Sequence, residues 1–299
     1  MMGETDGTLY YICKGIAAHK GKLMRPILVL LTAKEYGTIS ETTYYSALTL
    51  ELLHNASLVH DDIVDESDER RGRPSVRAVY GNKVGVLAGD YLLSSALESA
   101  AKTGDIRIVR DIAALGKHLS QGEIIQLSNT HQTDFSEDSY YDVIRLKTAS
   151  LFSSAARLGA LSVGASDEVV QRMNRIGEII GICFQIRDDI FDYFSSDIGK
   201  PTGNDMLEGK LTLPVLYALT HSGNIKMQAL ALKVREGLAN KADIDQLVSF
   251  TMDEGGIEYA HTCMTRYADE ALALISDFTH PDIKEALTTY IHFVCQRSI

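Results

Sequence analysis

Two short acidic motifs with the same spacing are the residues in this sequence best suited to chemistry. The aspartates are Asp61, Asp62 and Asp65 in the segment HDDIVDESDERRG, and Asp188, Asp189 and Asp192 in the segment QIRDDIFDYF. On a helix, residues four apart share a face, so each DDxxD pattern stacks two carboxylates, which destabilise the helix unless cations offset them. A solvated helix end is one interpretation of a single motif. Two such motifs, each after a strongly apolar stretch, instead predict a cage for cations that borders the core.

Carboxylate oxygens are hard ligands that suit Mg²⁺, which holds its waters tightly and binds through a few carboxylates together with substrate phosphates. A calcium-binding EF-hand is a poor fit, since DDIVDESDERRG lacks the central glycine and the alternating ligands of that loop. The motifs therefore predict a phosphate site that is bridged by Mg²⁺.

A phosphate site also needs fixed positive charge, and basic residues lie near both motifs. They are Lys22 and Arg25 in GKLMRP, Arg70 and Arg71 after the first motif, Lys147 before Thr148, and Lys200 and Lys210 after the second motif. Lys22 and Arg25 are three apart, so we expect them on one helical face, with Pro26 near the helix start. Each basic residue alone is more often a solvated surface charge. Their grouping beside two acid motifs favours diphosphate binding.

The bulk composition excludes several other classes of protein. The 299 residues are 45% apolar and 23% charged, as in an ordinary globular protein, and the net charge of −11 argues against a nucleic-acid partner. Four widely spaced cysteines without a CxxC pair argue against a zinc site or a disulfide framework. The first residues lack the pattern of a secretion signal, and the apolar runs are too short to span a bilayer. We therefore expect a cytoplasmic protein without a transmembrane segment.

The elements that carry these residues are predicted to be helices. Apolar residues recur at three- and four-residue spacing through most of the chain, and the alternating runs typical of strands are missing. We expect a single all-α domain over residues 1–299, in which long helices surround one core. The segment Val84–Ala101 is apolar around most of its circumference and rich in small residues. It should lie centrally or against a partner subunit, which favours a homodimer.

Several sequence blocks together resemble a known family, the trans-type isoprenyl (polyprenyl) diphosphate synthases. The blocks are GKLMRP, ELLHNASLVHDDIVDESDERRG, LAGDYLL, RLKTASLF, FQIRDDIFDYF and GKPTGNDMLEGKLTLP, in the order of the family. Within the family the chain is most similar to long-chain bacterial members such as octaprenyl and solanesyl diphosphate synthases. The resemblance implies the isoprenoid synthase fold, in which long, mostly antiparallel helices surround a central cavity and the acid motifs face each other across its mouth.

The resemblance also implies a reaction. Isopentenyl diphosphate would be condensed onto an allylic diphosphate, such as farnesyl or geranylgeranyl diphosphate, to give a long-chain all-trans polyprenyl diphosphate for a quinone side chain. Mg²⁺ ions, three per site, and the basic residues would stabilise the diphosphate that leaves as the allylic C–O bond breaks. The alternatives are a shorter-chain farnesyl or geranylgeranyl diphosphate synthase and a non-catalytic helical subunit of a heteromeric synthase.

Residue roles follow from the match to the family motifs. The principal Mg²⁺ ligands would be Asp61, Asp65 and Asp188, with Asp62, Asp189 and Asp192 assisting directly or through water. The allylic diphosphate would be held by Arg70, Lys147, Lys200 and Lys210, and isopentenyl diphosphate by Lys22, Arg25, His54 and Arg71. Thr148 and Gln185 would lie beside the reacting carbons, so that their dipoles stabilise the cation without trapping it.

The residues just before the first motif carry two further expectations. His54 lies two helical turns before Asp61 on the same face, which favours a ligand role, although a lone histidine on an apolar helix is more often a satisfied core residue. Ala56 and Ser57 lie one turn before the motif and are small, where short-chain relatives typically carry a bulky aromatic. A growing prenyl chain would therefore pass this level, which predicts a long product. The alternative is that the two small residues only let helices pack closely.

One departure from the family pattern concerns the start of the chain. Only about twenty residues precede GKLMRP, and AHKGKLMRP lacks the usual glycine pair, so we expect a first helix that is short or missing. A terpene cyclase is a further alternative, but its second metal motif has an Asn/Ser/Glu pattern instead of a second DDxxD. A structural Mg²⁺-binding protein would not need the basic residues around the motifs.

Overall fold

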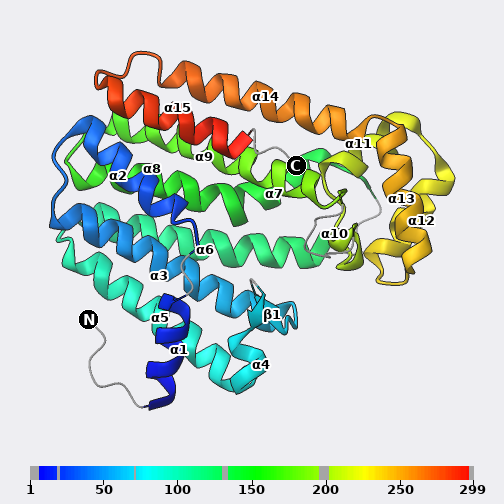
Figure 1. The fold of residues 1–299 in the computed structure, drawn as a ribbon, viewed down its shortest axis with the longest axis horizontal. Helices are drawn as coiled ribbons and strands as arrows, with labels where there is room; N and C mark the ends of the chain where they lie inside the picture. Colours follow the sequence, from blue (N-terminus) through cyan, green and yellow to red (C-terminus); the bar gives the residue numbers. More distant parts are fainter. Residues whose placement is uncertain (1–6, 19–20, 71, 130–133, 195–201, 296–299) are drawn as a thin grey trace. The chain divides into compact units, whose positions relative to one another are not determined.

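The computed structural model describes residues 7–18, 21–70, 72–129, 134–194 and 202–295. These residues are almost entirely helical, which confirms the all-α class (Figure 1). The helices are α1 Gly7–Ala18, α2 Met24–Tyr36, α3 Glu41–Val64, α4 Val76–Tyr80, α5 Asn82–Lys102, α6 Ile106–Asn129, α7 Glu137–Ile144, α8 Ser150–Ser162, α9 Asp167–Phe191, α10 Asn204–Leu207, α11 Leu213–Ser222, α12 Ile225–Arg235, α13 Lys241–Asp253, α14 Gly256–Leu274 and α15 Pro281–Cys295, with the π-helical turn η1 Arg145–Ala149 between α7 and α8. Two short antiparallel strands, β1 Glu69–Arg70 and β2 Arg73–Pro74, were not expected from the sequence.

Local sequence explains where several helices begin. The residue before α4, α7, α12 and α13 is short and polar, and its side-chain oxygen accepts a hydrogen bond from a backbone N–H of the first turn. These N-caps are Ser75, Ser136, Asn224 and Asn240. The turn between α13 and α14 is made by Gly255, which has a φ of 75°, a conformation that glycine adopts without strain.

Contacts divide the chain into two compact units, each of which is described by itself. The first unit comprises Met1–Lys117 and Ser154–Asn174, and the second comprises His118–Ser153 and Arg175–Ile299. The boundaries fall inside α6, α8 and α9. The expectation of one domain around a central cavity stays a prediction.

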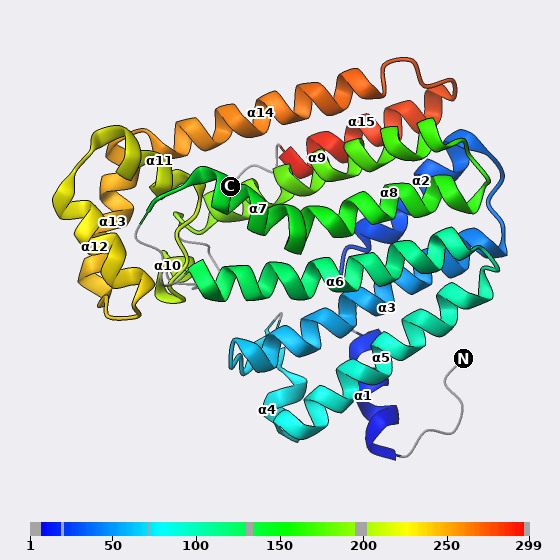
Figure 2. The ribbon, with the colours of Figure 1, turned by 180° about the vertical axis from the view of Figure 1, so that it is seen from behind.

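In the first unit, α3 and α5 lie side by side, with α2 packed on α3 (Figures 1 and 2). Small residues permit the close approach of α5, since a Cβ on Gly85 would meet Ile63 and a Cβ on Gly89 would meet the ring of His60. The short helix α1 adds the buried Ile12 and the partly buried Ile16 to an apolar cluster with α3 and α5. The buried members of this cluster are Ile12, Ala56, Val59, Ala88 and Leu92. The first helix is therefore short and present.

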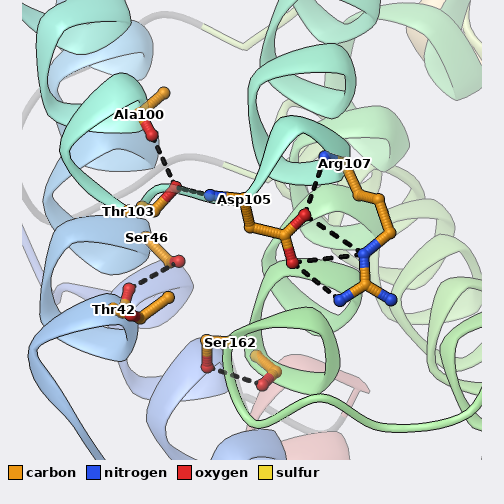
Figure 3. A network of polar contacts seen from close by, with 8 residues as sticks. Thr42, Ser46, Ala100, Thr103, Asp105, Arg107 and Ser162 are labelled. Atoms are coloured by element: carbon orange, nitrogen blue, oxygen red, sulfur yellow. Dashed lines mark hydrogen bonds and ion pairs between the residues drawn. The ribbon is translucent and has the colours of Figure 1, made fainter.

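The turn between α5 and α6 is held by local hydrogen bonds, as Figure 3 shows. The Thr103 hydroxyl donates to the carbonyl of Ala100 at 2.6 Å, and the backbone N–H of Asp105 donates to the Thr103 oxygen at 3.3 Å. The guanidinium of Arg107 donates to both oxygens of Asp105, which lowers the pKa of that carboxyl.

In the second unit, α14 and α15 lie side by side, and α11 packs on α13 and α14 (Figures 1 and 2). One apolar face of α9 is buried and includes Ile179, Cys183, Ile186 and Ile190. Among the described residues, no helix has both the length and the apolar character needed to cross a bilayer.

Candidate functional site

The first acid motif lies at the C-terminal end of α3, in the first unit. The helix ends at Val64, and the backbone N–H of Asp65 donates to the carbonyl of Asp61 at 2.8 Å. The side chain of Asp65 is exposed and that of Asp61 is partly exposed, whereas Asp62 is only 3% exposed. The first and last aspartates are therefore accessible, and the middle one faces the interior.

The strands β1 and β2 bring a basic residue back to this buried carboxylate. The Nε of Arg70 donates to Oδ1 of Asp62 at 2.6 Å, and the backbone N–H of Ser67 donates to the carbonyl of Asp62 at 2.9 Å. Burial raises the pKa of Asp62, while the hydrogen bond and the charge of Arg70 act in the opposite direction. Arg70, which the sequence predicts to hold a diphosphate, also holds this aspartate in place.

The predicted isopentenyl group is only partly arranged as expected. The sequence placed Lys22 and Arg25 on one helical face, and this prediction is wrong. Leu23 is in the left-handed region with a φ of 50°, and α2 begins after it at Met24, so Lys22 lies in the preceding turn.

Arg25 and His54 are joined by a hydrogen bond, with Arg25 Nη1 and His54 Nε2 3.0 Å apart. A guanidinium can only donate, so His54 accepts at Nε2 and is neutral there. The imidazole is 9% exposed. His54 is thus both a buried, hydrogen-bonded histidine and a support for a predicted ligand.

The residues expected to control chain length are not alike. Ala56 is 2% exposed and belongs to the apolar cluster between α1, α3 and α5. Ser57 is partly exposed, and its hydroxyl donates to the carbonyl of His54 at 2.9 Å. A path for a prenyl chain beside them stays a prediction.

The second acid motif lies at the end of α9, in the second unit, and its middle aspartate is again buried. Asp188 is exposed and accepts from Arg187 Nη2 at 3.0 Å. Asp189 is 2% exposed. Both oxygens of Asp192 accept backbone N–H groups at the start of α10, those of Asn204 at 2.9 Å and Asp205 at 3.0 Å. The last aspartate therefore anchors the segment that follows.

Negative charge accumulates around this motif. Burial, and after it the charge of Asp192, raises the pKa of Asp205 to about 7. In the described part of the chain, no three His, Cys, Asp or Glu side chains are gathered closely enough to hold a metal ion by themselves. The accessible carboxylates Asp61, Asp65 and Asp188 nevertheless fit Mg²⁺ chemically, because it takes hard oxygen ligands one or two at a time and draws the rest from water and phosphate.

The π-helical turn η1 carries Lys147 and Thr148. Its defining hydrogen bond joins the N–H of Ser150 to the carbonyl of Arg145, five residues earlier. The Lys147 ammonium forms an ion pair with Glu123 and donates to Gln126 at 3.2 Å. The amine that the sequence predicts to hold the allylic diphosphate therefore has protein partners on α6.

Thr148 and Gln185, each predicted to lie beside the reacting carbons, are hydrogen-bonded to each other at 2.6 Å. Gln185 in turn bonds Asp189, which also accepts from the hydroxyl of Tyr140 on α7. The sequence analysis missed Tyr140, because no local pattern connects α7 to α9.

The remaining predicted diphosphate ligands are Lys210, Arg71 and Lys200. Lys210 is partly exposed and pairs with Glu208 at 2.6 Å. Arg71 and Lys200 lie outside the described residues.

Comparison with known proteins defines the class to which this fold and these motifs belong. The model of the polyprenyl synthetase family matches residues 6–251. Component 2 of heptaprenyl diphosphate synthase from Geobacillus stearothermophilus is 38% identical over 257 residues, which is 85% of this chain and 79% of that protein.

Two solved structures are similar throughout. Geranylgeranyl pyrophosphate synthase from Bacteroides thetaiotaomicron is 47% identical with a TM-score of 0.88, covering 98% of this chain and 93% of that one. Polyprenyl synthase from Caulobacter crescentus CB15, complexed with calcium and isoprenyl diphosphate, is 29% identical with a TM-score of 0.91, covering 100% of this chain and 92% of that one. The chain belongs to the polyprenyl synthetase family, whose members are trans-prenyltransferases.

Proposed function

We propose that this protein is a Mg²⁺-dependent prenyltransferase that condenses isopentenyl diphosphate onto an allylic diphosphate. The observation that carries the proposal is the state of the two acid motifs. Each keeps an accessible first aspartate, Asp61 or Asp188, beside a buried second aspartate that is already hydrogen-bonded to protein donors. A protein that had lost the reaction would not need accessible acids of this kind at both positions.

Asp61, Asp65 and Asp188 would hold Mg²⁺, which when bound supplies positive charge to the leaving diphosphate. The allylic diphosphate would be bound by the basic side chains of Arg70, Lys147, Lys200 and Lys210. Isopentenyl diphosphate would be bound by Lys22, Arg25, His54 and Arg71. Thr148 and Gln185 would present their oxygen dipoles to the carbons where positive charge develops. The proton lost after the condensation would leave with the diphosphate, so no side chain has to act as a strong base.

We further propose that the product is a long-chain all-trans polyprenyl diphosphate, made from a farnesyl or geranylgeranyl primer. The similarity to a heptaprenyl diphosphate synthase component and the small Ala56 and Ser57 support a long product. A shorter product is the second candidate, because the similar structure with the higher identity is that of a geranylgeranyl pyrophosphate synthase, and because Ala56 is enclosed in an apolar cluster.

The proposed assembly is a homodimer in the cytoplasm. Helix α5 supports this, since Val86, Leu87 and Leu97 are exposed apolar side chains on it. The alternative is a heteromer, because the Geobacillus relative is described as one component of its synthase.

Incubation of the purified chain with Mg²⁺, labelled isopentenyl diphosphate and farnesyl diphosphate tests these proposals. We expect long polyprenols after dephosphorylation, abolished in Asp188→Asn and unchanged in Asp269→Asn, which alters an exposed aspartate on α14. Products that stop at geranylgeranyl length would contradict the long chain. A chain that extends none of the farnesyl, geranylgeranyl or shorter allylic primers would contradict catalysis by this protein alone and favour the heteromer.

A further inference from the structure

A chain of three hydrogen bonds in the second unit links helices α7 and α9 to the π-helical turn. The hydroxyl of Tyr140 donates to Oδ2 of Asp189 at 2.6 Å, and Nε2 of Gln185 donates to Oδ1 of the same carboxylate at 2.8 Å. The hydroxyl of Thr148 donates to Oε1 of Gln185 at 2.6 Å. The chain thus ends at the two residues that the proposed function places beside the reacting carbons.

The inner end of this chain is shielded from water. Asp189 is 2% exposed and Tyr140 is 8% exposed. Hydrogen bonds that water cannot reach are strengthened by the low local dielectric, and an unsatisfied partner there is costly. Both carboxylate oxygens of Asp189 already accept a bond from a protein donor, so the side chain is held toward Tyr140 and Gln185.

The donors and acceptors of these bonds fix the direction of each one. Nε2 of Gln185 donates to Asp189, so the NH₂ end of the amide faces Asp189 and its carbonyl end faces Thr148. The carbonyl in turn can only accept, so the Thr148 hydroxyl must donate to it. The Thr148 proton then points at Gln185, and the lone pairs of the Thr148 oxygen are left facing elsewhere.

We propose that Tyr140 and Asp189 are positioning residues that fix the amide of Gln185 and, through it, direct the oxygen lone pairs of Thr148 at the developing cation. This rests on the proposed function, which places Thr148 and Gln185 beside the reacting carbons. Asp189, expected from the sequence to assist a metal ion, acts here by orienting the side-chain amide of Gln185. Tyr140 acts because it holds the second oxygen of that carboxylate.

Kinetics of paired variants test the positioning role. Tyr140→Phe removes one hydroxyl, and we expect kcat to fall roughly tenfold with KM for both substrates within about twofold, since binding groups are untouched. Tyr141→Phe is the matched control, because it removes the hydroxyl of the neighbouring buried tyrosine, whose ring packs against that of Tyr267. We expect it to change the melting temperature about as much and kcat hardly at all. In a Gln185→Ala background, Tyr140→Phe should lower kcat no further, because the group through which it acts is gone.

A second measurement reads the orientation without any activity. In protein labelled with ¹⁵N in glutamine side chains, the Gln185 amide signal, assigned by its loss in Gln185→Ala, should be protected from exchange. We expect Tyr140→Phe and Asp189→Asn to reduce that protection, and Tyr141→Phe to leave it unchanged. An unaltered Gln185 signal in both Tyr140→Phe and Asp189→Asn would overturn the inference. So would a tenfold loss of kcat by Tyr140→Phe that persists without Gln185. A wild-type protein that makes no product but shows the expected signals would instead overturn the proposed function and leave the positioning role standing.

Discussion

The two acid motifs share their spacing, and in each motif the first aspartate is accessible while the second is buried. Asp61 and Asp188 are accessible, whereas Asp62 and Asp189 are buried and hydrogen-bonded to protein donors. Consecutive residues on a helix point about 100° apart, so an adjacent pair at the edge of a core has one member on each side of it. The doubled aspartate therefore supplies one accessible carboxylate, which is the proposed metal ligand, and one buried carboxylate that is bonded inside the protein.

This difference in burial predicts different effects on stability and turnover when each of the two neighbouring aspartates is replaced by asparagine. We expect Asp62→Asn to lower the free energy of unfolding by about 1–2 kcal/mol, because it weakens a charged hydrogen bond from the half-exposed Arg70. Asp61→Asn should change stability by less than about 0.5 kcal/mol, yet abolish Mg²⁺-dependent turnover. Urea unfolding followed by circular dichroism measures both. Equal stability losses in the two variants would contradict the assignment.

Helices α6 and α9 enclose the π-helical turn through two glycines. A Cβ on Gly122 would lie 2.8 Å from the side chain of Lys147, and a Cβ on Gly181 would lie 2.4 Å from the Cα of Ala149. Backbone cannot move aside as a side chain can. The position of η1, and with it the position of Lys147 and Thr148, therefore depends most on the glycine of α9.

We expect Gly181→Ala to displace η1, because the added methyl group overlaps backbone. The free energy of unfolding should fall by about 1–3 kcal/mol, as for other overpacked sites, and kcat should fall with it. Thermal melting and steady-state kinetics measure the two effects. Gly116→Ala, inside α6, is the control, because a Cβ at Gly116 would meet nothing within 4 Å. This change should stabilise the protein by up to about 1 kcal/mol, since alanine favours a helix more than glycine does. A Gly181→Ala protein with unchanged stability and turnover would contradict this packing.

The end of α15 is held by a basic residue of α9. Arg187 is 6% exposed, and its Nη1 donates to the carbonyls of Phe293 at 3.2 Å and Val294 at 2.8 Å. A positive charge bonded to the last carbonyls of a helix satisfies groups that have no partner inside the helix. Nη2 of Arg187 also donates to Asp188, so the guanidinium of Arg187 joins the last helix to an accessible aspartate.

We expect Arg187→Leu to lower the free energy of unfolding by about 2–3 kcal/mol and to loosen α15 first, because buried carbonyls lose their donor. Hydrogen exchange read by mass spectrometry should show the protection of residues 287–295 falling most. The exposed Arg266 on α14 provides the control variant Arg266→Leu, in which that protection should persist. Uniform loss of protection along the chain would argue against a local anchor.

At the level of assembly, α5 carries exposed apolar side chains that the proposed homodimer would bury. Leu87 is 67% exposed, and Val86 and Leu97 are each 42% exposed. The glycines Gly85 and Gly89 of the same helix face α3 instead. The glycines thus serve close packing inside the subunit, and the larger apolar residues are the candidates for association.

Leu87→Glu should weaken a homodimer that buries this surface, because a charge would have to be desolvated at the interface. We expect the dissociation constant from sedimentation velocity to rise at least about tenfold, corresponding to about 1.4 kcal/mol. Leu238→Glu changes a side chain that is 70% exposed after α12 and should leave sedimentation unchanged. Identical sedimentation of both variants would place the interface elsewhere.

Periodicity predicted the helices well, whereas the sequence said little about which side chains would become partners across them. The apolar spacing along α9 is buried, but Leu48, which continues the apolar spacing of α3, is 42% exposed, because an apolar pattern does not say which face of a helix a neighbour covers. Tyr140 and Asp189 are 49 residues apart, and their contact depends on tertiary packing alone. The error at Lys22 has a local cause. Leu23 adopts a left-handed backbone conformation, which nothing in the segment GKLMRP predicts.

The π-helical turn has a consequence for how this chain tolerates change in length. Helices α7 and α8 are continuous through η1, so its wide turn amounts to one added residue in an otherwise regular helix. Deleting one residue there would restore the ordinary repeat and rotate one side by about 100° relative to the other. Tyr140 could then face α9, or Thr148 could reach Gln185, but not both. Homologues that keep every chemical side chain yet lack this single insertion would have lost the register that brings them together.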